Sequence, residues 1–321
     1  MGMTRALRVT AGPIAAIALF LLPPTLEAQR VARGRDATAS DVHTLVHAGL
    51  KRTYVVRTPR ELSRSSTPLP VVVVLHGGGG NAENGEMMTG FTELVERERI
   101  IVVYPDGTAA RVRVALRTWN AVHCCGYAME AHVDDVGFVN AMLDSLATTY
   151  PVDANRIYAT GMSNGAMMTH RLGRELSHRF AAIAPVVGAV FGDEPDAKGP
   201  VSALMINGLR DKSVPAEGGP TGGRSAREWD GTPTKPNLEQ GAYWARANGC
   251  ATAPKKSERG TVITWRYDCP SGRAVEVLQL RDGGHAWPGG ERGSRLGDRP
   301  STAIDATEVM WAFFKEHPRR N

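Results

Sequence analysis

Short apolar runs alternate along the chain with amphipathic stretches, and this alternation predicts strands followed by helices. The runs with the length and composition of buried strands are residues 71–75, 100–104, 156–160, 201–208 and 275–280. Apolar residues at helical spacing follow over 136–150, 166–176 and 304–316. We therefore predict an α/β fold with a mostly parallel central sheet and helices on both of its faces.

Two local patterns refine this fold. Residues 45–56 indicate an opening hairpin that turns around His47-Ala48-Gly49. Asp134 and Asp135 stand directly before the helical stretch 136–150, where carboxylates suit the cap and the first turn. Both aspartates are therefore expected to be structural rather than catalytic.

Length and composition fit one domain. The chain has 321 residues, of which 42% are hydrophobic, and its 35 glycines indicate many turns. We assign residues 41–321 to this domain. Segment 212–238 interrupts the pattern, since it is rich in Gly, Pro, Ser and Thr. Loops this long are uncommon without a function, so we expect a rim or partial lid, with a surface insertion of no role as the alternative.

The N-terminus has the pattern of a signal peptide. Arg5 and Arg8 precede an apolar stretch over 11–22, and a cleavage site is predicted at Ala28. The apolar stretch is shorter than the roughly 20 residues of a spanning helix, so no stable membrane association is expected. Leu26 is not ideally small for a cleavage site, so a retained lipid-proximal anchor is the alternative. We predict a signal peptide over 1–28, a disordered lead-in over 29–40, and a secreted or periplasmic protein.

The stretch Gly161-Met162-Ser163-Asn164-Gly165 is the strongest indication of chemistry. It lies between a predicted strand and a predicted helix. Glycines fit such a tight turn, and the turn raises the serine hydroxyl above the edge of the sheet. The following N–H, at the helix N-terminus, points toward an attacked carbonyl. Ser163 is therefore predicted to be a nucleophile, with an ordinary tight turn as the alternative.

Three further elements stand at predicted strand ends. Asp211 follows the strand 201–208, and His285 follows the strand 275–280. The order serine, acid, histidine is that of the triad in α/β-hydrolases. Glycines 77–80 follow the strand 71–75, where their N–H groups can approach a developing oxyanion. Asp106 and Asp282 compete for the acid role but are less favoured, because Asp106 precedes the serine and Asp282 is too near His285 in the sequence.

Eight stretches carry a resemblance to a known family. They are LHGGGGNAENG (75–85), YPDG (104–107), WNAVHCCG (119–126), VDDVGFV (133–139), RIYATGMSNGAMM (156–168), INGLRDKSVP (206–215), NGC (248–250) and GGHAWPGG (283–290). With them, the chain resembles the secreted esterases that include polyhydroxybutyrate depolymerase-like proteins and feruloyl esterases, close to carbohydrate esterase family one. The resemblance covers most of the chain from Gly49 onward.

This resemblance implies an α/β-hydrolase with a Ser163–Asp211–His285 triad. It also implies an oxyanion hole from the Asn164 amide and one amide in the Gly77–Gly78 region. The implied function is a secreted serine esterase that hydrolyses short-chain or hydroxyacyl esters, such as polyhydroxybutyrate-type oligomers or aryl esters. Water would hydrolyse an acyl-enzyme, and no cofactor or metal is expected.

Two other functions are weighed against the esterase. The chain without its signal has 36 basic and 32 acidic residues, a net charge of +4 that is compatible with anionic substrates. The alternative substrate is therefore an anionic polymer such as polyaspartate, cleaved by the same triad. A catalytically inactive binding module is disfavoured because no candidate catalytic residue is missing. No basic run is dense enough for nucleic-acid binding.

The tryptophans and cysteines complete the candidate residues. Trp119 and Trp287 flank the predicted site, where either substrate contact or packing would explain them. Four cysteines allow three pairings. A Cys250–Cys269 bridge closing the intervening segment is predicted, while the adjacent Cys124 and Cys125 are either bridged or free. His123 lacks a second ligand group at suitable spacing, so no metal site is predicted.

Overall fold

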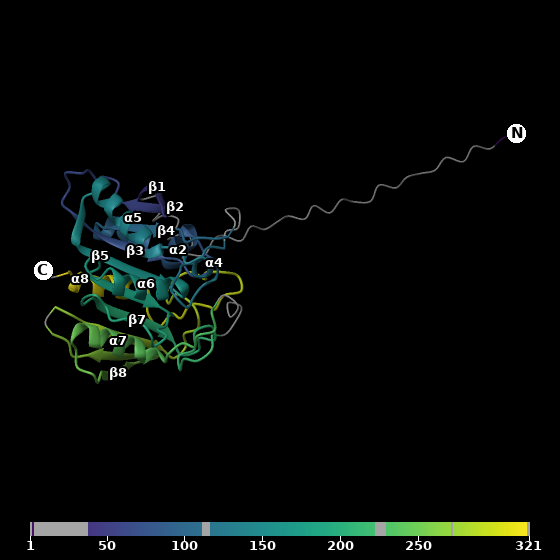
Figure 1. The fold of residues 1–321 in the computed structure, drawn as a ribbon, viewed down its shortest axis with the longest axis vertical. Helices are drawn as coiled ribbons and strands as arrows, with labels where there is room; N and C mark the ends of the chain where they lie inside the picture. The colour runs from purple at the N-terminus through teal and green to yellow at the C-terminus, as the bar shows by residue number, and fades with distance from the viewer. Residues whose placement is uncertain (1, 3–37, 111–115, 222–228, 271, 320–321) are drawn as a thin grey trace.

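The computed structural model describes residues 2, 38–110, 116–221, 229–270 and 272–319 (Figure 1). Apart from Gly2, the predicted signal peptide over 1–28 lies outside the described residues, as does the predicted lead-in through residue 37. The predicted end of that lead-in at residue 40 is wrong, because Ala39–His47 is the first strand. Among the described residues, no helix has the length and apolar character needed to span a membrane.

Ten strands form one sheet in the order β1-β2-β4-β3-β5-β6-β7-β10-β9-β8. The strands are β1 (Ala39–His47), β2 (Leu50–Thr58), β3 (Leu69–Leu75), β4 (Ile101–Pro105), β5 (Val152–Met162), β6 (Ala182–Val186), β7 (Ser202–Gly208), β8 (Lys255–Arg259), β9 (Val262–Tyr267) and β10 (Val275–Leu280). From β4 to β10 neighbouring strands are parallel, and antiparallel strands extend the sheet at both ends. The prediction of a mostly parallel sheet is confirmed.

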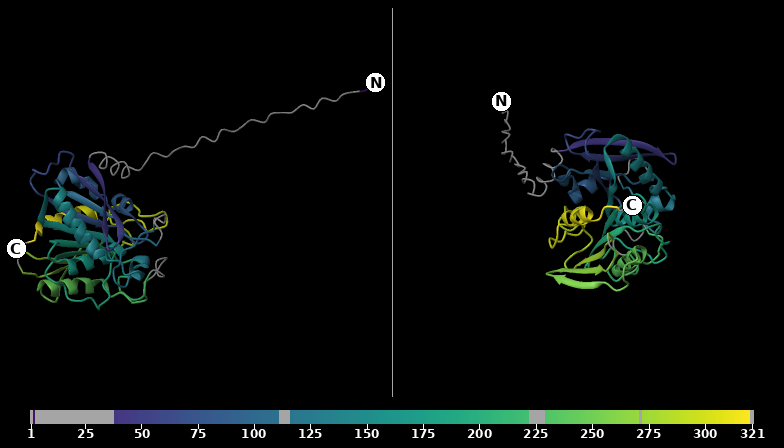
Figure 2. Two further views of the ribbon diagram at one scale, coloured as in Figure 1. Left: turned by 45° about the horizontal axis from the view of Figure 1, so that its top comes forward. Right: turned by 90° about the vertical axis from the view of Figure 1, so that its left-hand side faces the viewer.

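Helices cover both faces of this sheet, as predicted. They are α2 (Ala82–Thr89), the 3-10 helix η1 (Phe91–Glu93), α3 (Leu94–Glu98), α4 (Gly126–Glu130), α5 (Asp135–Thr149), α6 (Asn164–Glu175), α7 (Asn237–Asn248) and α8 (Ala306–Glu316). One apolar core contains residues of α5, α6 and α7, and the other contains residues of α2, η1, α3 and α8. Figure 2 shows α8, in yellow, on the opposite side of the sheet from α7, in green.

Strand β3 shows how the apolar pattern builds the two cores. Its seven residues are all buried, because side chains alternate between the two covered faces. Val71 and Val73 enter the core beneath α5 and α6, whereas Val72 and Val74 enter the core beneath α8. A continuous apolar run is therefore the expected sequence of this central strand.

The predicted hairpin and helix cap are both present. β1 and β2 pair in register around Ala48 and Gly49, whose φ values of 47° and 76° suit a two-residue hairpin turn. Asp134 caps α5 by accepting a hydrogen bond from the Gly137 N–H at 2.9 Å. Asp135 is buried and pairs with Arg52 at 2.7 Å. Both aspartates therefore have the structural roles predicted for them.

The parallel order brings the predicted catalytic residues to one edge of the sheet. Ser163 follows β5, Asp211 follows β7 and His285 follows β10. The carboxyl ends of parallel strands lie at the same edge, where α/β proteins bind their ligands. Strand β6 lies between β5 and β7, and β10 pairs with β7, so the loops converge above neighbouring strands.

Cys250 and Cys269 form the predicted disulfide, with an S–S distance of 2.07 Å and a Cα–Cα distance of 4.0 Å. The bridge encloses the β8–β9 hairpin at the end of the sheet. Strand β9 of this hairpin pairs with β10, which leads to His285, and β6, β7 and β10 separate the hairpin from β5, which leads to Ser163.

We expect the double substitution Cys250→Ala/Cys269→Ala to lower the free energy of unfolding by about 3 kcal/mol, because the unfolded chain loses a closed loop. Urea unfolding of the variant and of the oxidised wild type measures the difference. A change below about 1 kcal/mol would show that this bridge is dispensable for stability.

Candidate active site

Ser163 stands on a sharp turn between β5 and α6. Its φ of 57° and ψ of −121° are unusual for a residue with a side chain. Two glycines make the turn possible, because a Cβ on Gly161 would collide with the Gly165 carbonyl. A Cβ on Gly165 would collide with the carbonyls of Leu75 and His76. The motif therefore packs the turn directly onto β3 and presents the serine at the sheet edge.

His285 joins Ser163 to Asp211 through its two ring nitrogens. Its Nε2 lies 2.9 Å from Ser163 Oγ, and its Nδ1 lies 2.7 Å from Asp211 Oδ2. The Asp211 side chain is 1% exposed, and that of His285 is 18% exposed. This arrangement can remove a proton from the serine hydroxyl and stabilise the resulting imidazolium.

Asp211 is itself held in place. Its Oδ1 accepts hydrogen bonds of 2.8 Å from the N–H groups of Ser213 and Val214. The other oxygen remains directed at His285. Backbone donors therefore orient the carboxylate that orients the imidazole.

The competing aspartates are engaged elsewhere. Asp106 accepts hydrogen bonds from the Thr53 hydroxyl at 2.6 Å and the Ala82 N–H at 2.9 Å. Asp282 accepts one from the Ser301 hydroxyl at 3.0 Å. Both carboxylates stabilise loops, and Asp211 is the acid bonded to the His285 ring.

Asp298 is a site residue that the sequence patterns do not reveal. Its Oδ2 accepts a 2.7 Å hydrogen bond from the backbone N–H of His285. This contact fixes the loop that carries the imidazole. No spacing relates the two residues, so only the folded loop identifies the aspartate.

The amides expected to form an oxyanion hole lie beside Ser163. Asn164 is the first residue of α6, where the backbone N–H has no partner within the helix. A Cβ on Gly77 would lie 3.7 Å from Ser163 Cβ, and one on Gly78 would lie 3.6 Å from Asn164 Cβ. The Gly79 N–H is already bonded to Arg117 O. The amides of Gly77 and Gly78 therefore remain the candidates on the glycine loop.

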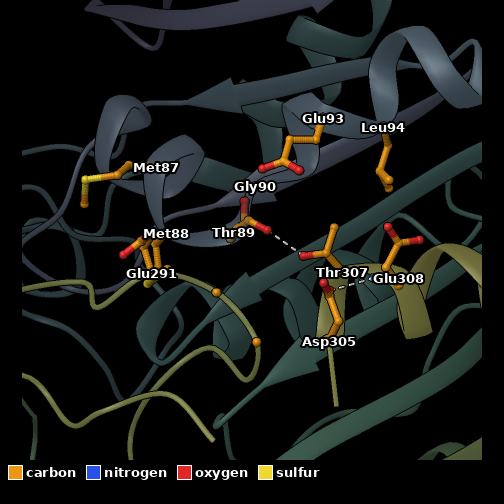
Figure 3. Close-up of a pocket in the computed structure, with 12 residues that line it drawn as sticks. Met87, Met88, Thr89, Gly90, Glu93, Leu94, Glu291, Asp305, Thr307 and Glu308 are labelled. Carbon is orange, nitrogen blue, oxygen red and sulfur yellow. Dashed lines mark hydrogen bonds between the residues drawn. The ribbon is translucent and has the colours of Figure 1, made fainter. Parts of the chain in front are cut away.

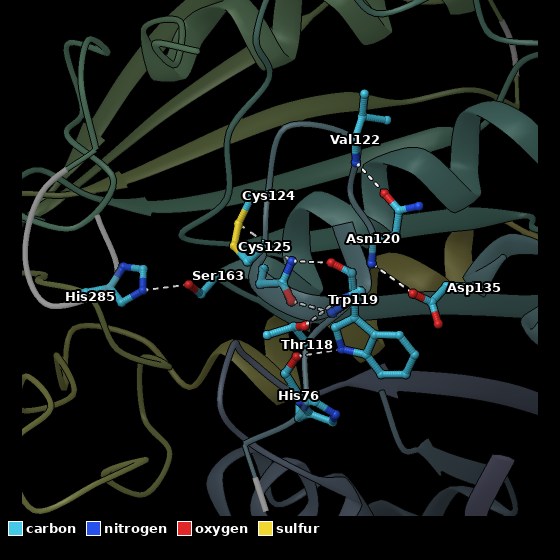
Figure 4. Close-up of a disulfide and its surroundings, with 12 residues drawn as sticks. His76, Thr118, Trp119, Asn120, Val122, Cys124, Cys125, Asp135, Ser163 and His285 are labelled. Atoms are coloured by element: carbon cyan, nitrogen blue, oxygen red, sulfur yellow. Dashed lines mark hydrogen bonds between the residues drawn. A yellow bond between two sulfur atoms is a disulfide. The ribbon is translucent and has the colours of Figure 1, made fainter. Parts of the chain in front are cut away.

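Asn164 is fixed by reciprocal hydrogen bonds to Trp119. The Trp119 N–H donates to Asn164 Oδ1 at 2.7 Å, and Asn164 Nδ2 donates to Trp119 O at 2.9 Å (Figure 4). The Trp119 indole N–H donates to His76 O at 3.0 Å. One residue thus connects the turn after Ser163 with the strand end that precedes Gly77.

His76 is buried, and burial keeps its ring neutral. Desolvation lowers the pKa of His76 to about 4, although its hydrogen bond to Gly77 O opposes this shift. The Gly107 N–H donates to His76 Nε2 at 3.0 Å, so Nδ1 carries the proton that is donated to Gly77 O at 2.7 Å. His76 therefore supports the glycine loop in one tautomer.

Trp119 and Trp287 are not placed to contact a substrate. Their exposed fractions are 0% and 1%. The Trp287 indole N–H donates to Thr307 Oγ1 at 3.1 Å, and its ring packs edge-on against Phe91. The prediction that these two tryptophans bind substrate is therefore wrong. Trp119 instead holds the Asn164 side chain in place, and Trp287 anchors the loop after His285.

A pocket between α2 and the start of α8 lies outside this constellation (Figure 3). Its lining residues are Met87, Met88, Thr89, Gly90, Glu93, Leu94, Gly289, Gly290, Glu291, Asp305, Thr307 and Glu308. Thr307 Oγ1 donates to Thr89 O, and the Glu291 N–H donates to Met88 O at 3.0 Å. The walls of this pocket thus anchor the loop that follows His285.

His123 connects the predicted rim with the segment after Trp119. Its Nδ1 lies 2.7 Å from Asp230 Oδ2, and its Nε2 lies 2.9 Å from Asp193 Oδ2. Burial alone would lower the pKa of His123, but these two carboxylates outweigh it and raise the pKa. Residues 222–228 of the predicted rim lie outside the described residues. Among those described, no three His, Cys, Asp or Glu side chains are grouped to hold a metal.

Comparisons with known proteins identify the family of this chain. The family model described as Esterase PHB depolymerase matches residues 54–218, which are 165 of the 321 residues. The chain belongs to this esterase family. It is therefore an α/β-hydrolase and an esterase.

Individual relatives of this esterase carry related names. It is 29% identical to "Putative esterase NocK" of Nocardia uniformis subsp. tsuyamanensis, over 79% of the chain and 76% of the relative. It is 28% identical to Feruloyl esterase B of Piromyces equi, over 70% of the chain but only 41% of the relative. An acetyl xylan esterase from Aspergillus awamori shares its fold, with a TM-score of 0.59 at 14% identity over 86% of this chain and 99% of that one.

We expect Asp211→Asn to lower kcat of this esterase by about 10³- to 10⁴-fold, because the amide no longer stabilises the imidazolium or fixes the tautomer of His285. Steady-state hydrolysis of p-nitrophenyl butyrate measures the loss. The matched controls Asp106→Asn and Asp282→Asn should each retain activity within about tenfold. A larger loss in either control than in Asp211→Asn would assign the acid elsewhere.

Proposed function

We propose that this protein is a secreted serine esterase that hydrolyses short-chain, hydroxyacyl or aryl esters through an acyl-enzyme on Ser163. The observation that carries the proposal is the continuous Ser163–His285–Asp211 hydrogen-bond relay. Amides of Asn164 and of the glycine loop lie beside the same serine.

The first half of the reaction forms the acyl-enzyme. His285 Nε2 takes the proton from Ser163 Oγ as this oxygen attacks the ester carbonyl carbon. The carbonyl oxygen becomes negative and is stabilised by the Asn164 N–H and one N–H of Gly77 or Gly78. His285 then protonates the leaving alkoxide, which departs as an alcohol.

The second half releases the acid. His285 takes a proton from water, and the resulting hydroxide attacks the acyl carbon in the same oxyanion hole. The tetrahedral intermediate collapses, and Ser163 Oγ regains its proton from His285. Asp211 stabilises the imidazolium in both halves without being protonated.

Apolar side chains on segments around the triad support a compact acyl or aryl group as substrate. Leu116 is 65% exposed, and its Cδ2 would lie 3.5 Å from a Cβ on Gly79, in the glycine loop. Val122 is 46% exposed and follows Trp119 by three residues, while Leu296 is 70% exposed and precedes Asp298 by two. Such isolated side chains suit small groups better than a long acyl chain, which requires a large continuous apolar surface.

Exposed cations favour a second candidate, the hydrolysis of an anionic polymer such as polyaspartate. The loop that delivers Asp211 carries Arg210 and Lys212, and the loop after His285 carries Arg292, Arg295 and Arg299. All five side chains are exposed. They would raise the local concentration of a polyanion, and salt would weaken this attraction.

Secretion is part of the proposal because of the cysteines. Both disulfides, Cys124–Cys125 and Cys250–Cys269, fit a protein that leaves the cytoplasm, where thiols are kept reduced. The predicted signal peptide over 1–28 gives the same localisation.

We expect Ser163→Ala to reduce p-nitrophenyl butyrate hydrolysis by more than about a thousandfold. The variant loses the nucleophile, and only the oxyanion hole and substrate binding still contribute to the rate. The melting temperature should stay within about 3 °C of wild type, since the serine side chain is not part of the core. Ser257→Ala, on exposed strand β8, is the matched control. Retention of more than about a hundredth of the wild-type rate would contradict the nucleophile assignment.

A substrate panel separates the two candidates. We expect hydroxybutyrate trimer, methyl ferulate or tributyrin to have a higher kcat/KM than triolein and polyaspartate, because a compact acyl or aryl group does not require the large continuous apolar surface that a long acyl chain does. Preference for polyaspartate, weakened by added salt, would establish the anionic polymer instead. Preference for triolein would contradict both candidates.

A further inference from the structure

The Trp119 loop, residues 119–125, contacts both sides of the candidate oxyanion hole. Through Asn164 it reaches the amide that follows the nucleophile, and through His76 it reaches the glycine loop. Trp119 is fully buried, so these hydrogen bonds are made without competition from water. The relative placement of the two sets of amides therefore depends on the shape of this loop.

A disulfide joins the adjacent residues Cys124 and Cys125 at the end of this loop. Backbone hydrogen bonds fold the chain back on itself, from Cys125 N–H to Trp119 O at 3.1 Å and from Ala121 N–H to Cys124 O at 2.6 Å. Asn164 Nδ2 lies 3.7 Å from Cys124 Sγ, within range of a weak N–H···S contact. The bridge thus lies against the residue that supplies the oxyanion amide.

The outer side of the loop is fixed by a buried ion pair. Arg52 and Asp135 are 2.7 Å apart and almost fully buried, and Asp135 Oδ2 accepts the Asn120 N–H at 2.8 Å. Arg171 donates to Asn120 O at 2.7 Å. The loop is therefore anchored at Asn120, and the disulfide constrains the backbone at its other end, residues 124 and 125.

We propose that the Trp119 loop, held by the Cys124–Cys125 disulfide, positions the oxyanion hole through the side chain of Asn164. This inference rests on the proposed serine esterase function. Asn164 then contributes twice, since its backbone N–H binds the oxyanion and its side chain sets where that N–H points. Cys124 and Cys125 are positioning residues, because they act through Asn164 and not on the substrate.

The test compares removal of each disulfide. Cys124→Ala/Cys125→Ala should lower kcat for p-nitrophenyl butyrate about 10- to 100-fold, less than the loss of a whole oxyanion donor. KM should change less than about threefold, and phenylboronic acid, which forms a tetrahedral serine adduct, should bind more weakly by a factor similar to the loss in kcat. The matched control Cys250→Ala/Cys269→Ala should keep wild-type kcat and boronate affinity while losing stability.

Asn164→Ala provides an independent arm that leaves both disulfides intact. It keeps the backbone N–H but removes both bonds to Trp119, so it should show the same loss of kcat and boronate affinity. In a variant that combines Asn164→Ala with Cys124→Ala/Cys125→Ala, kcat should fall by less than about a further threefold relative to the cysteine variant. The reason is that both changes act on the same contact between the Trp119 loop and Asn164. If the cysteine variant does not fold, Cys124→Ser, which also removes the bridge, replaces it in the same comparison with Asn164→Ala.

Wild-type kcat and boronate affinity in folded Cys124→Ala/Cys125→Ala or in Asn164→Ala would overturn the inference. Fully multiplicative losses in the combined variant would also overturn it, since the two changes would then act separately. Failure of the proposed function has a different signature, namely a wild type without esterase activity or activity that survives Ser163→Ala.

Discussion

The candidate site depends on the close approach of three backbone segments: the end of β5 at Gly161, the start of α6 at Gly165, and the end of β3 at Leu75 and His76. Gly165 packs against the carbonyls of Leu75 and His76, so α6 begins directly above the end of β3. This contact forces Ser163 to a positive φ and sets the first N–H of α6 beside the glycine loop. The cost of such a backbone is of the order of 1–3 kcal/mol, and it persists because the buried strands on both sides determine it.

Around this contact, positions are fixed by hydrogen bonds between groups of the protein. The amide of Asn164 bonds Trp119, and the neutral ring of His76 holds the glycine loop. Asp298 likewise holds the backbone N–H of His285, and Asp211 holds its ring. Preorganised dipoles of this kind stabilise developing charge without having to reorient during the reaction, which is the main source of catalytic power in acyl transfer.

The sequence predicts the fold and the order of the candidate catalytic residues because local patterns encode both. Apolar runs mark β3 and most of β7, a mixed apolar and polar run marks β10, and the glycines around Ser163 mark the turn. Asp298 and the roles of Trp119 and Trp287 could not be predicted, since they depend on contacts between distant loops. A buried tryptophan and a substrate-binding one have the same appearance in sequence, so only the exposed fraction separates them.

The most direct test of the account is a crystal structure of the enzyme after reaction with a p-nitrophenyl alkylphosphonate. The account predicts phosphorus bonded to Ser163 Oγ, with one phosphoryl oxygen about 2.7–3.1 Å from the Asn164 N and from the N of Gly77 or Gly78. His285 Nε2 should remain within hydrogen-bond distance of Ser163 Oγ. Phosphorus on another residue, or a phosphoryl oxygen directed away from these amides, would contradict it.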